Sequence, residues 1–236
     1  RDFCLSRGLG DVYKRQGYSE PKKWNKLAVA PIWLKDKFLM LIGREAENAR
    51  QGKKARIVAK MNSLCDPVIM NALYDASKAG VKIDLIVRGI CCIKAGVPGL
   101  SENISVRSIV GNYLEHSRIF YFYNDGFEDI YMGSADWMPR NLDKRVEITF
   151  PVEDPGLKTK VKEILQIQLA DTLKAHIMQP DGSYVKQDLR GKNRLDSQMY
   201  FVKKAQAGQE IDGETENTRV FIPIESHEDE EDSQTE

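Results

Sequence analysis

Apolar residues recur along the chain with two different periods, and the first clear period is helical. In the segment "WLKDKFLMLIGREAENARQG", the positions Leu34, Phe38, Leu41 and Ile42 lie three or four residues apart. This spacing puts them on one side of a helix, and the segment turns polar before it reaches Gly52. The pattern predicts an amphipathic helix of about four turns that ends at a left-handed cap formed by Gly52.

The following segment predicts a strand, a helix and a second strand. Residues 57–59 form a short apolar run, and Asp66 directly before Pro67 is typical of a helix N-terminus. Residues 68–76 then have helical spacing up to Gly80, and residues 81–87 alternate as a strand. A unit of this length is expected to place its two strands parallel, through a right-handed crossover.

Further strands and a long helix follow. The segments "ISVRSIVG", "HSRIFYFYN", "DIYMGSAD" and "RVEITFPV" read as four strands, with a turn at "NDGFED". An apolar stripe from Leu157 to Ile177 predicts one long helix beginning at Pro155, which would carry His176. The predicted fold class is therefore α/β, a mixed sheet flanked by helices that covers residues 28–178.

The formal net charge of zero conceals two parts of opposite charge. Of the 35 basic and 35 acidic residues, the first 208 positions hold 34 and 24, a balance of about +10. A basic body favours an anionic partner such as a nucleotide, polyphosphate, nucleic acid or a membrane surface, although solvated helix faces would give the same balance. The acidic segment from about residue 208 is expected to be disordered.

Several classes of protein do not fit the composition. No stretch approaches the ~18 apolar residues of a membrane span, and the first sixteen residues lack the apolar core of a signal peptide. The four cysteines, at positions 4, 65, 91 and 92, include no C-x-x-C pair and are expected to be reduced thiols. We therefore expect a cytoplasmic protein, with association to a membrane surface left open.

Polar residues fall at the carboxyl ends of the two parallel strands, where ligands gather in such sheets. Lys60, Asn62 and Ser63 follow the first strand, and Arg88 with Gly89 follows the second. A glycine at that place permits close approach of a backbone or a ligand. Arg88 is thus a candidate ligand contact, and an unengaged surface arginine is the alternative.

A second group of candidates lies in "YLEHSRIFYF". In an extended segment His116 and Arg118 share one side, so a guanidinium and an imidazole could meet the same phosphate. A lone histidine is more often structural, but His116 has a charged neighbour. Ser134 and Asp136 in "GSADW" and the run "RNLDKR" lie beside other strand ends.

Three long segments resemble the carboxyl-terminal part of type 1 polyphosphate kinase. They are "KMNSLCDPVIMNALYDASKAGVKIDLIVRGICC", "GLSENISVRSIVGNYLEHSRIFYF" and "MGSADWMPRNLDKRVEITFPV", and the resemblance extends over residues 17–201. It implies a phospholipase D-like domain and reversible transfer of the terminal phosphate of ATP to polyphosphate. By motif match, Arg88 and His116 would carry the family's nucleotide-contacting arginine and histidine.

The resemblance also implies what this chain lacks. The family's phosphate-accepting histidine, which makes it a phosphoprotein, and its Mg²⁺-associated residues belong to a preceding domain, so the chain is expected to be a fragment with no metal ligands of its own. Arg118, Ser134, Asn141 and Arg145 become weaker candidates for phosphate contact or for orienting His116. Asp136 is expected to hold the histidine or an arginine, because like charges repel.

The expected organisation has three parts. Residues 1–16 match nothing in the family and are expected to be a non-native leader, residues 17–180 the catalytic domain, and residues 181–236 an extension with the acidic tail. ATP or ADP and polyphosphate are the implied partners, without nucleic acid, and the full-length enzyme is expected to be a homo-oligomer.

Two alternatives stay open. A phospholipase D-like phosphodiesterase needs the motif His-x-Lys-x4-Asp, where this chain has His116 but Arg118 and Tyr123 at the other two places. The isolated chain is also consistent with a polyanion-binding module without catalysis.

Overall fold

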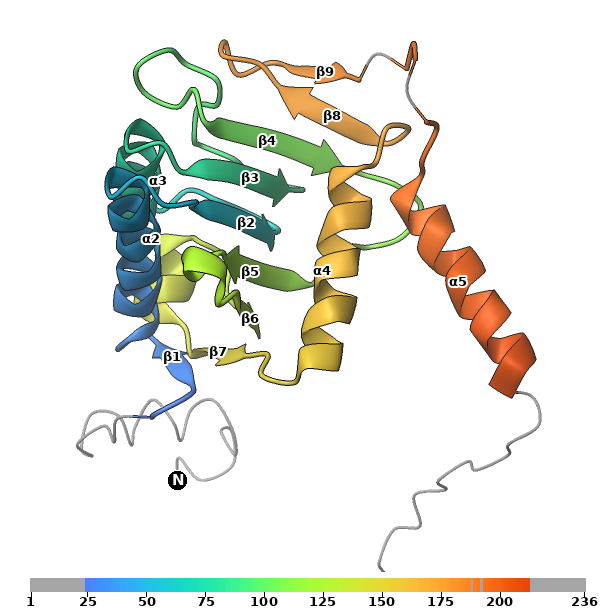
Figure 1. Ribbon diagram of the computed structural model, residues 1–236, viewed down its shortest axis with the longest axis horizontal. Helices are drawn as coiled ribbons and strands as arrows, with labels where there is room; N and C mark the ends of the chain where they lie inside the picture. The colour runs from blue at the N-terminus through green and yellow to red at the C-terminus, as the bar shows by residue number, and fades with distance from the viewer. Residues whose placement is uncertain (1–23, 188, 192, 213–236) are drawn as a thin grey trace, which may run out of the picture. The chain divides into compact units, whose positions relative to one another are not determined.

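The structure, a computed structural model, describes residues 24–212 apart from residues 188 and 192 (Figure 1). Its strands are β1 (Ala28–Ala30), β2 (Arg56–Met61), β3 (Lys82–Val87), β4 (Ile104–Ile109), β5 (Arg118–Phe122), β6 (Asp129–Gly133), β7 (Glu147–Pro151), β8 (Ala175–Met178) and β9 (Tyr184–Lys186). Its helices are α2 (Leu34–Arg50), α3 (Pro67–Lys78), α4 (Pro155–Leu169) and α5 (Ser197–Asp212), with a 3₁₀ turn η1 (Asn124–Gly126) and a π-helical turn η2 (Arg140–Lys144).

The described strands form one mixed sheet in the order β1-β7-β6-β5-β2-β3-β4-β8-β9. Strands β2, β3 and β4 are parallel to one another, and β5 is antiparallel to β2, with Lys60 opposite Ile119. Because of this reversal, the start of β5 lies at the same edge of the sheet as the ends of β2 and β3. Residues that follow β2 and β3 can therefore meet residues that precede β5.

Helices cover both faces of this sheet. Along β2, Ile57 and Ala59 pack into a core with α2 and α3, whereas Val58 packs into a second core with Val161 and Leu165 of α4. This alternation follows from the two-residue period of a strand, and it places α4 across the sheet from α2 and α3 (Figure 1). The predicted mixed sheet flanked by helices is confirmed.

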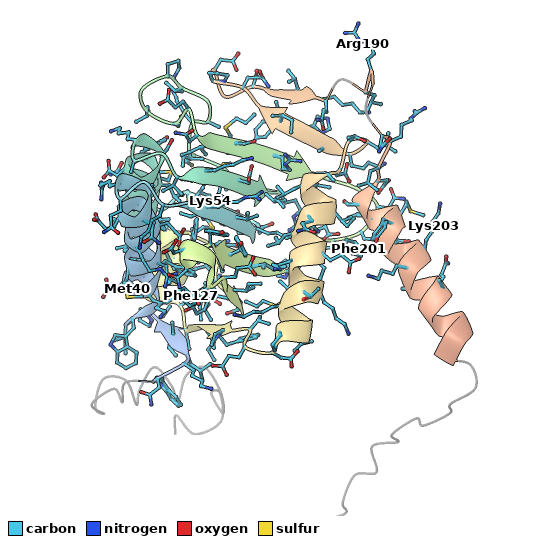
Figure 2. All side chains as sticks on the ribbon, in the orientation of Figure 1. Met40, Lys54, Phe127, Arg190, Phe201 and Lys203 are labelled. Carbon is cyan, nitrogen blue, oxygen red and sulfur yellow. The ribbon has the colours of Figure 1, made fainter. Side chains whose placement is uncertain are left out.

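The first core is dense in aromatic side chains. The Phe120 ring centroid lies 4.6 Å from that of Phe38 and 5.2 Å from that of Trp137. Phe38 belongs to the apolar stripe of α2, while Met40 on the same helix points to solvent and is 53% exposed (Figure 2). The stripe read from the sequence is thus the face that packs on the sheet.

Several local predictions are confirmed. Helix α2 ends at Arg50, just before Gly52, and the Asp66 side chain accepts hydrogen bonds of 3.0 Å from the amides of Val68 and Ile69 at the start of α3. Strands β2 and β3 are parallel along their whole length. The four strands predicted between residues 104 and 152 are β4, β5, β6 and β7.

The long final helix was predicted to run too far. Helix α4 ends at Leu169, and His176 lies on strand β8, opposite Ser108 of β4. The buried Asp171 carboxylate accepts hydrogen bonds from the amides of Lys174 and Ala175, at 2.8 and 3.1 Å, and these bonds turn the chain out of the helix. The apolar spacing continues to Ile177, but Ile177 belongs to strand β8 and not to the helix.

The chain beyond residue 178 contains a strand and a helix that the sequence did not predict. Strand β9 pairs with β8, so the expected boundary at residue 180 does not divide the sheet, and α5 continues to Asp212, past the expected start of the disordered tail. The described residues form two compact units that divide after Met199. The predicted leader and the tail after residue 212 lie outside the described residues.

A membrane-spanning helix is absent from the described part of the chain. Its longest helix, α2, has 17 residues, and none is both long and apolar enough to cross a bilayer.

Candidate active site

Arg88 leaves the end of β3 and reaches the residue that follows β2. Its Nε donates to the Asn62 side-chain oxygen at 3.0 Å, its Nη2 also donates to that oxygen, and among the described residues the buried Nη1 has no hydrogen-bond partner. The Gly89 amide donates to the Asn62 carbonyl at 2.7 Å, and a Cβ at Gly89 would lie 2.9 Å from the same oxygen. The glycine thus permits close approach of another backbone, and Arg88 keeps one donor for a further oxygen.

A buried carboxylate holds the second arginine. Arg118, at the start of β5, donates from Nε and Nη2 to the two oxygens of Asp136, at 3.1 and 3.0 Å. Both side chains are buried, and Asp136 also accepts from the amides of Asn62 at 2.7 Å and Ser63 at 3.3 Å. The structure therefore places Asp136 on an arginine, one of the two positions expected for it.

His116 contacts Arg118 as the shared side of an extended segment predicts. The Nη1 of Arg118 lies 2.9 Å from Nδ1 and 3.2 Å from Nε2 of the imidazole, and it donates to the His116 carbonyl at 2.8 Å. A guanidinium has no acceptor, so the ring nitrogen that it bonds must accept. In the neutral ring the other nitrogen carries the hydrogen, and the histidine is exposed.

Arg88 and His116 lie at the same edge of the sheet and are linked by other side chains. The side-chain oxygen of Asn62 accepts from Arg88, and the backbone amide of Asn62 donates to Asp136. Asp136 binds Arg118, which contacts His116. The link uses residues that follow β2, β3 and β6 and residues that precede or begin β5. Two guanidinium groups and one imidazole are thereby fixed relative to one another.

The weaker candidates divide between two places. Ser134 donates to Glu147 at the start of β7, and Asn141 donates to the same carboxylate at 2.5 Å, while the buried Oδ1 of Asn141 has no partner among the described residues. Ser134 and Arg118 line one open groove, whose wall is otherwise mainly apolar. Arg145 is exposed, and its amide donates to the Arg140 carbonyl at 3.0 Å at the end of η2.

A buried lysine completes the edge. Lys60 is 3% exposed, donates to the Ser117 hydroxyl at 2.8 Å and pairs with Glu115 at 3.3 Å. Burial lowers the pKa of Lys60, and Glu115 opposes that shift. Lys60 and Arg88 line the same hollow as Glu115, so two basic groups and one carboxylate meet there.

Sequence reasoning named Lys60 and Asn62 only as polar residues at a strand end, and it did not name Glu115 or Glu147. Lys60 did carry a signal, because a lysine inside the apolar run of a buried strand is rarely left without a partner. Glu115 and Glu147 carry none, since their partners lie far away in the sequence. Among the described residues, no three His, Cys, Asp or Glu side chains gather as metal ligands would.

Comparison with known proteins decides the family. Residues 27–198 match the family model described as polyphosphate kinase C-terminal domain 2. The chain belongs to the polyphosphate kinase family. It is 57% identical over 169 residues to a polyphosphate kinase of Synechocystis sp., which covers 72% of this chain and 23% of that protein.

One solved structure agrees with this assignment. The crystal structure of polyphosphate kinase from Porphyromonas gingivalis matches with a TM-score of 0.78 and 40% identity, over 85% of this chain and 32% of that one. A phospholipase D family member, Nuc from Salmonella typhimurium, is a more distant neighbour, with 19% identity and a TM-score of 0.44, over 60% of this chain and 90% of that one. The chain thus spans about a quarter to a third of the polyphosphate kinases that it matches.

Proposed function

We propose that the chain is the nucleotide- and phosphate-binding part of a polyphosphate kinase, which transfers the terminal phosphate of ATP reversibly to polyphosphate. The observation that carries the proposal is that Nη1 of Arg88 has no partner among the described residues and that Arg88 lies at the same edge of the sheet as the Arg118 and His116 pair. Guanidinium groups bind phosphate oxygens in a forked geometry that lysine does not reproduce. Membership of the family supplies the substrate class.

The proposed roles follow from the chemistry of phosphoryl transfer. The bond between the γ-phosphorus and its bridging oxygen breaks, ADP leaves, and the phosphoryl group passes to an acceptor histidine expected in the preceding domain and then to a terminal polyphosphate oxygen. Such a reaction depends mainly on positioning and on compensating charge. Arg88 would hold phosphate oxygens, and His116 would donate a hydrogen bond to the transferring group or exchange a proton with it.

The remaining groups would support these two residues. Arg118, with both its other nitrogens held by Asp136, would fix the imidazole and add positive charge. Ser134, Asn141 and Arg145 stay proposals for weaker phosphate contacts. Mg²⁺ would compensate phosphate charge when bound, and we propose that its ligands belong to the preceding domain, as we propose for the phosphate-accepting histidine.

The setting of the reaction is also proposed. We expect ATP or ADP and polyphosphate as partners, no nucleic acid, a cytoplasmic location with membrane association left open, and a homo-oligomer for the full-length enzyme. Because the chain spans only part of its relatives, we expect it to bind polyphosphate and not to consume ATP by itself.

The proposal is tested by binding of tripolyphosphate and ADP to the chain, measured by calorimetry at several salt concentrations. Replacing Arg88 by Ala removes a charge-assisted contact of about 1.5–3 kcal/mol, so affinity should fall by roughly tenfold to a hundredfold. Arg88→Lys should recover only part of the loss. The matched control is Arg50→Ala, an exposed arginine at the end of α2, and it should bind as the wild type does.

Two results would reject the proposal. The first is tripolyphosphate affinity that is the same in Arg88→Ala and in the wild type. The second is hydrolysis of a phosphodiester such as bis(p-nitrophenyl) phosphate by the wild-type chain that is lost in His116→Ala, which would favour the phosphodiesterase alternative.

A further inference from the structure

The residue that must be held in place, His116, belongs to a loop with little support of its own. The segment 110–117 joins β4 to β5, and Leu114 is 73% exposed. His116 and Ser117 are exposed as well. A loop of this kind has to be fixed by contacts from elsewhere if its imidazole is to stay in one position.

Glu115 supplies such contacts. One carboxylate oxygen lies 3.3 Å from the Lys60 ammonium and accepts from the Gln168 amide at 3.1 Å, and the other oxygen accepts from the Gln198 amide at 3.3 Å. The three donors come from β2, from the end of α4 and from the start of α5. One side chain thus joins the loop to three separate segments.

The donors are more deeply buried than the carboxylate. Lys60, Gln168 and Gln198 are each less than 5% exposed, so their positions are set by packing. Hydrogen bonds that involve an ionised group are stronger than neutral ones. Glu115 therefore fixes the loop on rigid partners.

Two of these donors hold the loop at further points. The Gln198 side chain donates to the Tyr113 carbonyl at 2.8 Å and accepts from the Tyr113 amide at 3.0 Å. Lys60 donates to the carbonyl of Ser117 at 3.2 Å and to its hydroxyl at 2.8 Å. Contacts on both sides of His116 therefore come from the side chains that bind Glu115.

Gln198 is in turn anchored through its neighbour Ser197, which binds Asp171, two residues after the end of α4. The Asp171 carboxylate accepts from the Ser197 amide at 2.8 Å and from its hydroxyl at 2.6 Å. Both residues are fully buried. The bonds between Ser197 and Asp171 thus place Gln198 in contact with the loop.

We propose that Glu115 is a positioning residue, which sets the place of His116 by tying its loop to Lys60, Gln168 and Gln198. The inference rests on the proposed function, in which His116 meets phosphate. It gives the chain after residue 180 a role at the site, since Gln198 belongs to it. Glu115 acts through His116, because its own charge would repel a phosphate.

The test uses Glu115→Gln, which keeps the size of the side chain and removes the charge. Amide hydrogen exchange, followed by NMR at Tyr113, reports the position of the loop without any ligand, because the Tyr113 amide donates to Gln198. Exchange at this amide should be at least about tenfold faster than in the wild type if the loop is released. The matched control Glu102→Gln, at an exposed glutamate of another loop, should leave the rate unchanged.

The second measurement links the loop to His116 by a double-mutant cycle. Glu115→Gln should weaken tripolyphosphate binding by about threefold to tenfold when His116 is present and should change it little in the His116→Ala background. A role in general stability would lower affinity equally in both backgrounds. Gln198→Ala, which removes the Tyr113 contacts and one donor to Glu115, should accelerate exchange at the Tyr113 amide and gives the answer if Glu115→Gln does not fold.

The outcomes separate this inference from the proposed function. Unchanged amide exchange in Glu115→Gln and Gln198→Ala, or an equal loss of affinity in both backgrounds, would overturn the positioning role. If instead neither His116→Ala nor Arg88→Ala alters tripolyphosphate binding while the loop is released in Glu115→Gln, the proposed function fails and the tie to the loop stands.

Discussion

The carboxylate of Asp136 is the most connected charge at the candidate site, and its loss should be costly. It accepts two hydrogen bonds from Arg118 and two from the backbone amides of Asn62 and Ser63, and the side chain is 2% exposed. We consider Asp136→Asn, which keeps the shape of the side chain and one of its two acceptor oxygens. The change removes the negative charge and turns the other oxygen into a donor that faces Nη2 of Arg118.

The expected loss of unfolding free energy depends on which hydrogen bonds remain in Asp136→Asn. Removing one partner of a buried ion pair costs about 3–5 kcal/mol, because the other charge stays buried without compensation. In Asp136→Asn the remaining oxygen still accepts from the two amides, each worth about 1 kcal/mol, so we expect a loss of roughly 2–4 kcal/mol in the free energy of unfolding. That is a large part of the ~5–15 kcal/mol by which native domains are stable.

The assay is urea unfolding followed by tryptophan fluorescence, since Trp137 is fully buried in the core beside this site. With a slope of about 2 kcal/mol per molar urea, the midpoint should fall by roughly 1–2 M. Asp143→Asn is the control. Its carboxylate pairs with Lys35 at 3.2 Å but is 44% exposed, and such a pair contributes less than about 1 kcal/mol.

A double-mutant cycle with Arg118→Met isolates the pair itself. If the reasoning is right, much of the loss in Asp136→Asn disappears once Arg118 is gone, because no buried charge is then left alone. Additive losses in the double variant, or a midpoint shift no larger than that of Asp143→Asn, would refute it.

Two further predictions concern packing and thiol chemistry. A methyl group at Gly133 would collide with the backbone of Ile148, so Gly133→Ala should lower the free energy of unfolding by about 1–3 kcal/mol. Gly43 lies in open space on α2, so Gly43→Ala should raise the free energy of unfolding by about 0.5–1 kcal/mol. Equal urea midpoints for the two variants would contradict this. Burial raises the pKa of Cys91 to about 11, so at pH 8 its thiol stays protonated. Iodoacetamide should therefore label the exposed Cys92 first, and labelling of Cys91 should rise as the pH approaches 11. Mass spectrometry of the labelled peptides checks the order.

Local signals in the sequence were sufficient for much of the fold. The Asp66 cap needs only the two amides that follow it, and the apolar stripe of α2 needs only its own spacing, so both could be predicted. The end of α4 could not. Asp171 is held by Ser197, which is 26 residues away, and the apolar spacing up to Ile177 gave no sign of that contact.

The same distinction applies to the candidate site. His116 and Arg118 are two residues apart, so their contact follows from strand geometry. The partner of Arg88, Asn62, lies 26 positions away and is brought close by the parallel pairing of β2 and β3. The partner of Lys60, Ser117, lies 57 positions away, and the placement of β5 beside β2 brings it close. Lys60 therefore entered the sequence reasoning as a strand-end residue without a partner, and Glu115 did not enter it.

The two strands at the outer margins of the sheet have a consequence for the behaviour of the chain in solution. Of the described strands, β1 and β9 are the outermost, and each has only three residues. Each of these strands offers a neighbouring molecule only a short row of backbone groups for hydrogen bonding, and β9 carries Lys186. Stacking of copies into fibres through these margins is accordingly disfavoured.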